Sequence, residues 1–279
     1  MKDLAILMSL FNPDKKHLIE VLNEFSDIDI YLADDNPNSN LDGQIFKKLK
    51  NTFYFHNAKN IGIAASLNNI LEKLSDYNYV FFLDQDTIVS RSELQSHYFK
   101  FQNIESNNKI GMGASSYYYT KKYQYVFNKP IGLGVYPNDS NITPRVYYAN
   151  LSGLLVDFAK MKRVGFFDTS LFMDYVDVEF GFRANNRGYR VYINNNIILN
   201  HKIGDIVLRL PVLNRLLSIH RPSRMINIYK TLCKVFFGNY PYIKFTYKLS
   251  QLVKLLIVLP LKLIYLFLFA FNLLVKDEK

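Results

Sequence analysis

Acidic residues gather at three places in this chain, and the first two places each follow an apolar run of strand length. The segment Asp84-Gln85-Asp86 comes directly after the run Tyr79–Leu83. Two carboxylates that lie two residues apart in a turn can bind one hard divalent cation, directly or through a ribose hydroxyl. A solvated acidic turn is the other interpretation of this pair, so its position at the end of a strand is the informative feature.

The second acidic turn, Asp34-Asp35-Asn36, follows the apolar run Ile28–Ala33. Turns rich in Asp and Asn often cap helices through their own side chains. At the end of a strand, one of these carboxylates can instead face the base of a bound nucleotide. Both interpretations stay open at this point.

The third cluster holds Asp174, Asp177 and Glu179, and Arg183 follows one helical turn later. Crowded carboxylates raise one another's pKa, which suits a general base. Acidic residues are also common in the first turn of a helix, where they face the positive end of the helix dipole. His201 stands alone after a predicted strand, and a lone histidine is a core residue, a surface residue or a metal ligand.

The elements that must hold these acids alternate along the first half of the chain. Short apolar runs, typical of strands buried on both faces, are separated by segments with apolar residues at helical spacing. Asn12-Pro13 predicts a helix start with Pro at the first helical position, and Asn60-Ile61-Gly62 predicts a second helix through about Leu74. Strands that alternate with helices predict an α/β fold with a mixed, mostly parallel sheet flanked by helices. The predicted strands are Leu4–Phe11, Ile28–Ala33, Thr52–Phe55 and Tyr79–Leu83.

Ligands of such sheets bind at the carboxyl ends of the strands. Asp34-Asp35 and Asp84–Asp86 both fall at those ends, so we expect them at one edge of the sheet. From about Asp205 the pattern becomes helical, basic and apolar. Before that point, the further predicted strands are Val146–Phe158, Arg190–Ile193 and Ile197–Leu199.

The composition excludes several classes of protein. The 279 residues are 49% hydrophobic and 21% charged, with 12 Gly and 9 Pro, which excludes a disordered tail, a collagen-like chain and a linker-rich scaffold. A single cysteine, Cys233, excludes a disulfide framework and a cysteine-based zinc site. The apolar run at the N-terminus is too short for a secretory signal, so we expect a cytoplasmic location.

The positive charge is confined to the C-terminal part of the chain. The net charge is +10, and residues 1–200 hold 21 basic and 21 acidic residues. Residues 201–279 hold 13 basic and three acidic residues, and 13 − 3 accounts for the whole excess. We therefore expect a neutral domain that carries the chemistry at residues 1–205 and a basic, helical, membrane-associating region at residues 206–279.

Residues 244–276 predict an amphipathic helix that is interrupted near Pro260. At about 100° per residue, its polar side chains fall within a sector of roughly 120°. Leu252–Val275 is long enough to span a bilayer, but Lys262 near its middle would cost about 2.5–3.5 kcal/mol there. We therefore expect the helix to lie in the interface against anionic lipid, with packing against the protein body as the alternative. The polar residues are Lys244, Lys248, Gln251, Lys254, Lys262, Asn272 and Lys276.

Taken together, these segments resemble the family 2 glycosyltransferases of the GT-A fold, and in particular a bacterial rhamnosyltransferase-like branch that builds surface polysaccharides. The resemblance runs from about Leu4 to Tyr229 and rests on motifs that occur in the family's order. They are the opening strand and its turn, Leu4–Asn12; Ala33-Asp34-Asp35-Asn36; Asn60-Ile61-Gly62-Ile63-Ala64 with Asn68; Leu83-Asp84-Gln85-Asp86; and Phe172–Glu179 with Arg183 and Gly188-Tyr189.

On the donor side, the resemblance implies a site for a nucleoside diphosphate sugar. Asp34 or Asp35 would contact its base or ribose. Asn60 and Gly62 belong to the motif that opens a helix in the nucleotide site. Asp84 would contact the ribose or a metal ion.

On the acceptor side, the resemblance implies that Asp177 is the catalytic base, which takes the proton from an acceptor hydroxyl. Asp86 and His201 would hold Mg²⁺ or Mn²⁺, and this cation would neutralise the charge that develops on the diphosphate. The acceptor oxygen attacks the anomeric carbon from the opposite face, so the product has inverted configuration.

The chain departs from the family pattern at two places. Val176 stands where many relatives have a Glu before the catalytic Asp, and Asp174 is the candidate to replace that Glu as supporting acid. Lys230-Thr231 stands where relatives commonly have Arg-Asn. Arg224, which shortly precedes Lys230-Thr231, is a candidate to hold the diphosphate. Lys202, earlier in the chain, is another candidate.

The expected function is transfer of rhamnose to a lipid-linked glycan in capsule, O-antigen or cell-wall polysaccharide synthesis. The donor would be dTDP-rhamnose, or a UDP-hexose carrying galactofuranose, glucose or galactose, and the enzyme would lie peripherally on the inner face of the cell membrane. A nucleotidyltransferase is an alternative, but Leu10-Phe11-Asn12-Pro13 offers no Gly-rich phosphate loop. A second alternative is a non-enzymatic protein that binds membranes or nucleic acid. Lysines interleaved with aliphatic runs do not suit nucleic acid, so we expect no nucleic-acid partner.

Overall fold

The computed structural model describes residues 1–41, 46, 49–119, 124–126, 143–202, 206–210, 215–219, 222–253, 256 and 260. The chain divides into two compact units, residues 1–202 and residues 203–279. The first unit contains the large sheet and all three acidic clusters, so the fold of this unit decides how the predicted site is built.

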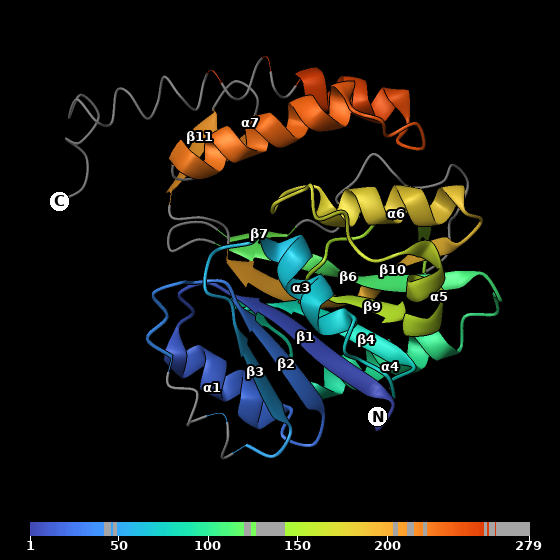
Figure 1. Ribbon diagram of the computed structural model, residues 1–279. Coiled ribbons are helices and arrows are strands. Elements are labelled where there is room, and N and C mark those ends of the chain that lie inside the picture. The colour runs from blue at the N-terminus through green and yellow to red at the C-terminus, as the bar shows by residue number, and fades with distance from the viewer. Residues whose placement is uncertain are drawn as a thin grey trace. The chain divides into compact units, whose positions relative to one another are not determined.

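Four parallel strands form one half of this sheet in the order β3-β2-β1-β4 (Figure 1). β1 (Leu4–Leu10) is buried along nearly its whole length, as expected of a strand covered on both faces. The register pairs Leu10 with Asp34 and Ser9 with Asp84, so both predicted acidic turns leave the sheet at the same edge. The neighbouring strands are β2 (Asp29–Asp34), β3 (Thr52–His56) and β4 (Tyr79–Asp84).

The other half of the sheet contains antiparallel pairs. β9 runs antiparallel to both β4 and β6, whereas β6 and β10 are parallel to each other, and short β5 pairs with the end of β10. The predicted α/β fold with a mixed sheet is therefore confirmed. The bounds are β5 (Thr87–Ile88), β6 (Lys109–Tyr119), β7 (Gln124–Val126), β8 (Arg145–Val146), β9 (Leu154–Asp157) and β10 (Arg190–Lys202).

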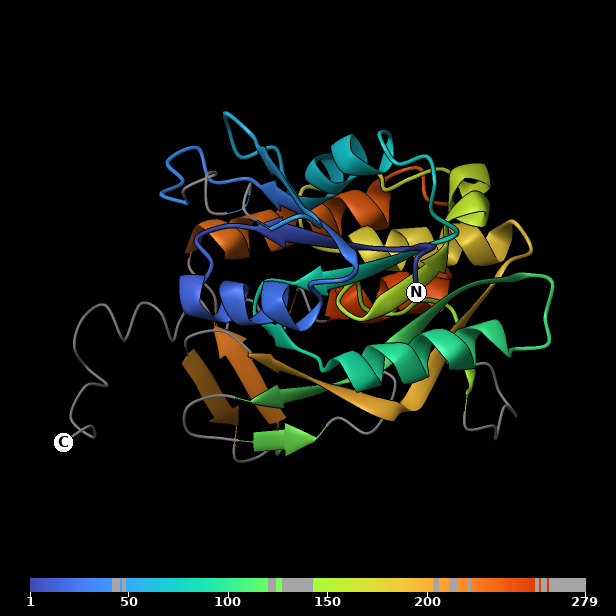
Figure 2. The ribbon, with the colours of Figure 1, turned by 90° about the horizontal axis from the view of Figure 1, so that it is seen from below.

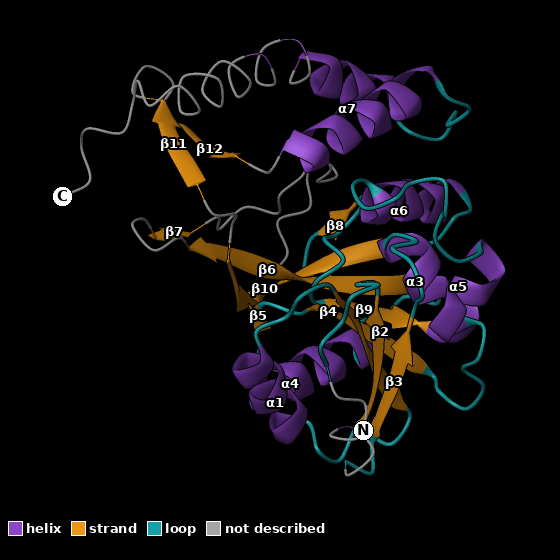
Figure 3. Ribbon diagram, turned by 60° about the vertical axis from the view of Figure 1, so that its left-hand side comes forward, coloured by secondary structure: helices purple, strands orange, loops and turns teal. Residues whose placement is uncertain are grey.

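Helices cover both faces of the sheet. α1 (Lys15–Glu24) and α4 (Arg91–Gln102) lie on one face (Figure 2), where their apolar residues join one core cluster with the strands. α3 (Ile63–Leu71), α5 (Phe158–Val164) and α6 (Val176–Asn186) lie on the other face (Figure 3). The second face therefore carries the two helix starts, of α3 and α6, that the sequence analysis assigned to the site.

Three predictions of local structure in the first unit are wrong. Asp14, and not Asn12-Pro13, caps α1, because its carboxylate accepts hydrogen bonds from the backbone N–H groups of the first helical turn. The predicted strand Val146–Phe158 is two short strands, β8 and β9, separated by a loop. The two predicted strands after Arg190 are one strand, β10, with an irregularity in its register between Asn194 and Ile198.

The first elements described in the second unit are strands rather than a helix. β11 (Ile206–Leu210) and β12 (Arg215–Ile219) pair antiparallel, so the predicted helical pattern from Asp205 is wrong over this stretch. α7 (Pro222–Phe237) and a helix over residues 245–253 follow. Within the described residues, no helix combines the length and the apolar character needed to cross a bilayer. Most of the predicted amphipathic helix, including Lys254, Lys262, Asn272 and Lys276, lies outside the described residues.

A buried histidine joins α4 to the sheet. His97 Nε2 donates a hydrogen bond to the Met112 carbonyl oxygen at 2.9 Å, and Asn194 Nδ2 donates to His97 Nδ1 at 3.2 Å. Burial lowers the pKa of His97 to about 4, and the nearby Lys100 ammonium acts in the same direction. The imidazole is therefore neutral in the folded protein at physiological pH.

We expect the stability of the protein to fall in mild acid because of His97. The unfolded chain binds this proton near pH 6.5 and the folded protein near pH 4, so the stabilisation is complete above pH 6.5 and is lost as the pH falls towards 4. Linkage gives a loss of about 2 kcal/mol between pH 7.5 and pH 5. Urea unfolding at the two pH values measures it. The His97→Gln variant should lack this component, and an unchanged pH dependence in that variant would contradict the assignment.

Candidate active site

A hydrogen bond between two asparagine side chains joins the turns that follow β1 and β2. Asn12 has φ 52°, a left-handed conformation that non-glycine residues seldom adopt. Its Oδ1 accepts a hydrogen bond from Asn36 Nδ2 at 2.7 Å. Asp34 is fully buried and accepts hydrogen bonds from the Tyr54 hydroxyl at 2.7 Å and the Asn36 backbone N–H at 3.0 Å. The two turns are therefore one connected structure at the carboxyl edge of the sheet.

Asp35, which is 4% exposed, fixes the start of α3. Its Oδ2 accepts the Gly62 backbone N–H at 2.8 Å, and its Oδ1 accepts Asn57 Nδ2 at 2.8 Å. The side chain of Asn60 accepts from the same Gly62 N–H at 3.2 Å. Gly62 has φ 87°, and a Cβ atom there would clash with the Phe172 carbonyl oxygen, so the position requires glycine. Asp35, Asn60 and Gly62, all predicted for the nucleotide site, thus form one cluster.

The Asp84-Gln85-Asp86 turn is attached to β1 by its central residue. Asp84 ends β4, Asp86 lies in the turn before β5, and both are half-buried. The Phe11 N–H donates to Gln85 Oε1 at 2.6 Å, and Gln85 Nε2 donates to the Phe11 carbonyl oxygen at 3.0 Å. These two bonds continue the contact between the strands beyond their last paired residues. Gln85 therefore positions both acids relative to β1, a role that its sequence position did not reveal.

Two adjacent residues connect this turn to the predicted catalytic base. Ser152 Oγ accepts the Asp84 backbone N–H at 3.1 Å and shares a hydrogen bond with Thr87 Oγ1 at 2.7 Å. The Leu151 backbone N–H donates to Asp177 Oδ2 at 3.1 Å. One short segment before β9 thus contacts both Asp177 and the backbone of Asp84, which brings together two site residues that are 93 positions apart in the sequence.

Asp177 lies in the first turn of α6 and is half-buried. Its pKa is raised to about 6, mainly by burial and also by the negative charge of Asp84, which together outweigh the lowering effect of hydrogen bonds from the Val178 and Leu151 backbone N–H groups. A carboxylate with a pKa near 6 is ionised at neutral pH and basic enough to accept a proton. A raised pKa was predicted from the crowding of acids, whereas burial is the larger cause.

A strained residue precedes α6. Tyr175 has φ 69°, and among the described residues Asn12 and Tyr175 are the only non-glycine residues with positive φ. Such a conformation is an outlier for a bulky side chain and persists only where the surroundings hold it. Both outliers lie beside predicted site residues, and no pattern in the sequence identified either of them.

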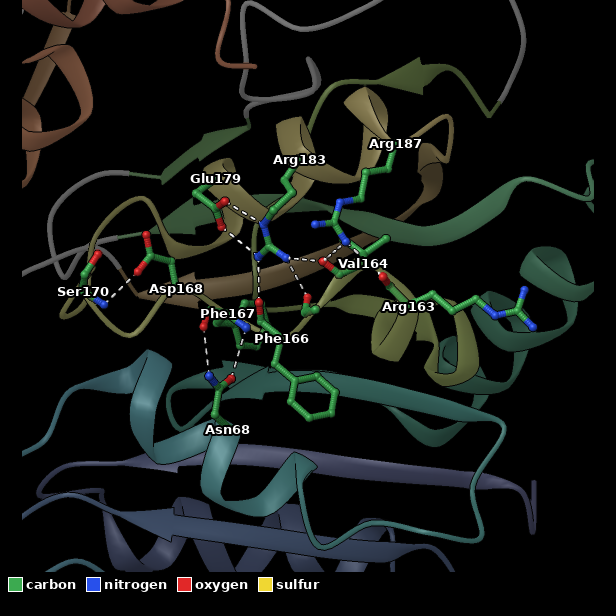
Figure 4. A network of polar contacts seen from close by, with 11 residues as sticks. Asn68, Arg163, Val164, Phe166, Phe167, Asp168, Ser170, Glu179, Arg183 and Arg187 are labelled. Atoms are coloured by element: carbon green, nitrogen blue, oxygen red, sulfur yellow. Dashed lines mark hydrogen bonds and ion pairs between the residues drawn. The ribbon is translucent and has the colours of Figure 1, made fainter. Parts of the chain in front are cut away.

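A buried ion pair holds the loop that leads to α6 (Figure 4). Glu179, 1% exposed, binds Arg183 through two bonds of 2.7 and 2.9 Å. The Arg183 guanidinium also donates to the carbonyl oxygens of Val164, Gly165 and Phe166 at 2.6–2.8 Å. The helix that carries Asp177 is therefore fixed to the loop after α5, and Glu179 serves this structure rather than an acid cluster with Asp177.

From the opposite side, Asn68 of α3 binds the same loop. Its side chain donates to the Phe167 carbonyl oxygen at 2.9 Å and accepts the Phe167 N–H at 3.1 Å (Figure 4). Further along, the Ile63 N–H donates to the Phe172 carbonyl oxygen at 2.8 Å. The start of α3, which Asp35 holds, and the approach to Asp177 are thereby parts of one hydrogen-bonded structure.

We expect the Arg183→Met variant to lose about 3–5 kcal/mol of unfolding free energy, because it leaves the buried Glu179 carboxylate without its guanidinium. The carbonyl oxygens of Val164, Gly165 and Phe166 each lose the hydrogen bond from Arg183 as well. Arg187 is a matched control: it also donates to the Val164 carbonyl oxygen, at 2.9 Å, but it is exposed. The Arg187→Met variant should lose less than about 1 kcal/mol. Urea unfolding measures both, and equal losses would contradict the structural role given to the ion pair.

The remaining predicted residues are placed less completely. The backbone of His201 pairs with Thr87, the residue after Asp86, whereas nothing is described of its side chain. Among the side chains that are described, no three His, Cys, Asp or Glu residues form a group that could hold a metal ion. Arg224 is exposed on α7 and belongs to the second unit. The structure therefore brings Asp84 and Asp177 together, links His201 to the turn of Asp86 by strand register, and leaves Arg224 in the other unit.

Comparison with known proteins gives matches over most of the chain. The model of the family "Glycosyl transferase family 2" matches residues 15–163, more than half of the chain. The dTDP-rhamnosyl transferase RfbF of Shigella flexneri is 28% identical over 230 residues, which cover 77% of this chain and 73% of that protein.

Solved structures share the fold at low sequence identity. S. aureus TarS, residues 1–349, in complex with UDP-GlcNAc has a TM-score of 0.57 at 14% identity, over 92% of this chain and 72% of that one. GalNAc-T7 with UDP, GalNAc and Mn²⁺ has a TM-score of 0.56 at 12% identity, over 86% of this chain. The chain spans about half of the GalNAc-T7 chain, 49%. These two likenesses identify the fold.

Proposed function

The chain belongs to glycosyl transferase family 2 and has the GT-A fold of these enzymes, and from this premise we propose that it transfers rhamnose from dTDP-rhamnose to a hydroxyl of a lipid-linked glycan. The similarity to the dTDP-rhamnosyl transferase RfbF supports rhamnose as the favoured sugar. A UDP-hexose, carrying galactofuranose, glucose or galactose, is the second donor class, which the UDP-containing relatives support.

The contact of one segment with both Asp177 and the backbone of Asp84 is the observation that carries the chemical proposal. Leu151 and Ser152 hold the acceptor-side and donor-side acids close enough for the charge of Asp84 to raise the pKa of Asp177. A glycosyl transfer needs this arrangement, because the base must lie beside the anomeric carbon of a donor that is bound at the strand ends.

Asp177 is the catalytic base of the proposed reaction. It takes the proton of the acceptor hydroxyl while the oxygen forms a bond to the anomeric carbon. The bond from that carbon to the diphosphate breaks on the opposite face, and its electron pair leaves with the nucleoside diphosphate. Attack and departure on opposite faces invert the anomeric configuration, and no enzyme nucleophile takes part. Asp174, three residues earlier, is the proposed supporting acid.

A divalent cation is proposed to bind at the end of β4. Carboxylates of Asp84 and Asp86, with the imidazole of His201, are ligands that Mg²⁺ and Mn²⁺ accept, and the strand register places His201 opposite the residue that follows Asp86. The Mn²⁺ bound with GalNAc-T7 supports the same choice. A cation held there would neutralise negative charge on the departing diphosphate.

The donor nucleotide is proposed to bind along the turns after β1, β2 and β4. An ionised carboxylate has about four acceptor positions, and internal hydrogen bonds occupy two on Asp34 and two on Asp35. Asp34 or Asp35 is the proposed contact to the base or ribose, beside the Asn60–Gly62 turn; Asp35 is 4% exposed, whereas Asp34 is fully buried. Arg224 is a proposed diphosphate ligand.

We further propose that the enzyme works in the cytoplasm, on the inner face of the cell membrane, where a lipid-linked acceptor would be available. Residues 1–205 would form the catalytic domain, and residues 206–279 would form the part that meets the membrane. The excess positive charge of residues 201–279 supports this division.

A donor screen tests the proposed function. Thermal unfolding is followed with dTDP-rhamnose, UDP-galactofuranose, UDP-glucose and UDP-galactose, each with Mn²⁺ and with excess chelator. We expect dTDP-rhamnose with Mn²⁺ to stabilise the protein most. If a UDP-hexose stabilises the protein most, the proposed donor is a UDP-hexose and not dTDP-rhamnose. Stabilisation that survives the chelator would exclude the proposed metal site.

A further inference from the structure

The second unit exposes many large apolar side chains on its described helices. Seven of these side chains are 45–77% exposed. They lie in a single stretch of about 30 residues that includes most of α7 and the helix that follows it. Apolar surface concentrated in this way marks a contact with another molecule more often than it marks free solvent exposure. The exposed side chains are Ile226, Tyr229, Phe237, Phe245, Leu249, Val253 and Leu256.

The helix over residues 245–253 has a buried face and an exposed face. Tyr247 and Gln251 on one face are each 5% exposed. Phe245, Leu249 and Val253 are 69%, 45% and 47% exposed, and at about 100° per residue they fall within a sector of about 80° on the opposite face. Leu256 is 66% exposed and continues this series, which we call the apolar row. The helix thus packs through one face and presents the apolar row to solvent.

Positive charge lies beside the apolar row. Lys244 is exposed and Lys248 is half-exposed, and both fall about 60–100° from Phe245 around the helix. Lysines at the border of an apolar face can keep their ammonium groups in water while their stems cover apolar surface. The prediction that Gln251 belongs to this polar border is wrong, because Gln251 is buried.

We propose that the apolar row inserts into the interfacial region of a bilayer rich in anionic lipid, with Lys244 and Lys248 at the headgroups. Residues 201–279 carry 13 basic and three acidic residues, so an anionic surface is attracted to this unit. A second copy of the chain would instead bring like charges together. The inference deepens the proposed function and rests on it for one point, that the acceptor is lipid-linked.

Vesicle co-sedimentation of the full-length protein tests the inference. The probes are vesicles of phosphatidylcholine alone and of phosphatidylcholine mixed with phosphatidylglycerol, at low and high salt. We expect binding to the anionic vesicles to be stronger by about tenfold or more at low salt. The double variant Phe245→Gln, Leu249→Gln should bind both kinds of vesicle about tenfold more weakly. The double variant Lys244→Gln, Lys248→Gln should lose affinity only for the anionic vesicles.

A matched control removes the same kinds of side chain from the first unit. Ile19 and Phe99 are 41% and 49% exposed, so the double variant Ile19→Gln, Phe99→Gln changes one aliphatic and one aromatic residue on the surface and should bind vesicles like the wild type. Equal effects of the two apolar variants would overturn the inference. The inference would also be overturned if the wild-type protein bound neither kind of vesicle. It would be overturned as well if the only change in the apolar-row variant were a smaller oligomer in size-exclusion chromatography.

Vesicle binding requires neither donor nor turnover, so it fails or succeeds independently of the proposed reaction. A protein that binds anionic vesicles but releases no nucleoside diphosphate would count against the proposed function alone. A protein that transfers sugar but binds no vesicle would count against the membrane surface alone.

Discussion

The Asp177→Asn variant is expected to lower kcat by about 10²–10⁴-fold, the usual contribution of a general base. Asparagine keeps the shape of the side chain and an oxygen for the Leu151 N–H, but it cannot take the acceptor proton. Donor affinity should stay within about threefold, because the lost interaction acts on the acceptor in the transition state. Steady-state kinetics and donor titration measure the two effects.

The same carboxylate predicts a pH dependence. The proposed reaction needs ionised Asp177, whose pKa is raised to about 6 by burial and by the charge of Asp84. We therefore expect kcat/KM to be constant near neutral pH and to fall about tenfold per pH unit below 6.

Stability separates this role from simple misfolding. Because the raised pKa means that folding disfavours the charged carboxylate, a neutral asparagine should not lower the free energy of unfolding at pH 7. The Asp174→Asn variant changes the proposed supporting acid, which lies in the loop before α6, and should lower kcat less than the Asp177→Asn variant does. Wild-type turnover in the Asp177→Asn variant, or a loss of donor binding with residual turnover, would refute the assignment of Asp177 as base.

The Asp86→Ala variant is expected to lose at least about 100-fold in kcat/KM and most of its metal-dependent donor binding. Asp86 lies half-buried in the turn after β4, where its removal takes away a negative charge without opening the core. Without this proposed ligand, added Mn²⁺ should no longer increase the donor-induced rise in melting temperature. The rate and the thermal shift are measured with Mn²⁺ and with excess chelator.

Asp76 gives a matched control for this variant. It is an exposed acid just before the amino end of β4, at the opposite end of the same strand. The Asp76→Ala variant should keep both the rate and the response to Mn²⁺. Wild-type activity of the Asp86→Ala variant in excess chelator would dismiss the proposed metal role of Asp86.

The parts of the site that follow strand ends could be predicted from the sequence. The apolar runs before Asp34 and Asp84 are long enough to identify buried strands, and parallel strands place their carboxyl ends at one edge of a sheet. The pattern of apolar residues is therefore enough to predict that both acidic turns lie at that edge. The observed register, which pairs Leu10 with Asp34 and Ser9 with Asp84, confirms this part of the prediction.

The contacts that hold the acids could not be predicted, because they join distant residues through backbone groups. Leu151 binds Asp177 through its N–H, which leaves no trace in the type of its side chain. Gln85 looks like a spacer between two acids until its bonds to Phe11 are seen. The left-handed Tyr175 is equally hidden, since only tertiary packing can hold a tyrosine in that conformation.

In the second unit, the secondary structure itself was predicted wrongly from the sequence. The stretch 206–219 is rich in aliphatic residues, and short apolar runs suit a strand as well as a buried helix. The local pattern favoured a helix there, whereas β11 and β12 pair over five residues each. Pairing between two strands is a tertiary interaction that the local pattern of either strand does not contain.

The most direct test of the account is the release of nucleoside diphosphate from dTDP-rhamnose by the full-length enzyme with Mn²⁺, with and without a lipid-linked glycan fraction as acceptor. We predict release that depends on the acceptor for the wild type, and almost none for the Asp177→Asn variant, although that variant still binds donor. Release at the wild-type rate by Asp177→Asn would contradict the account. So would the absence of acceptor-dependent release from every sugar nucleotide tested.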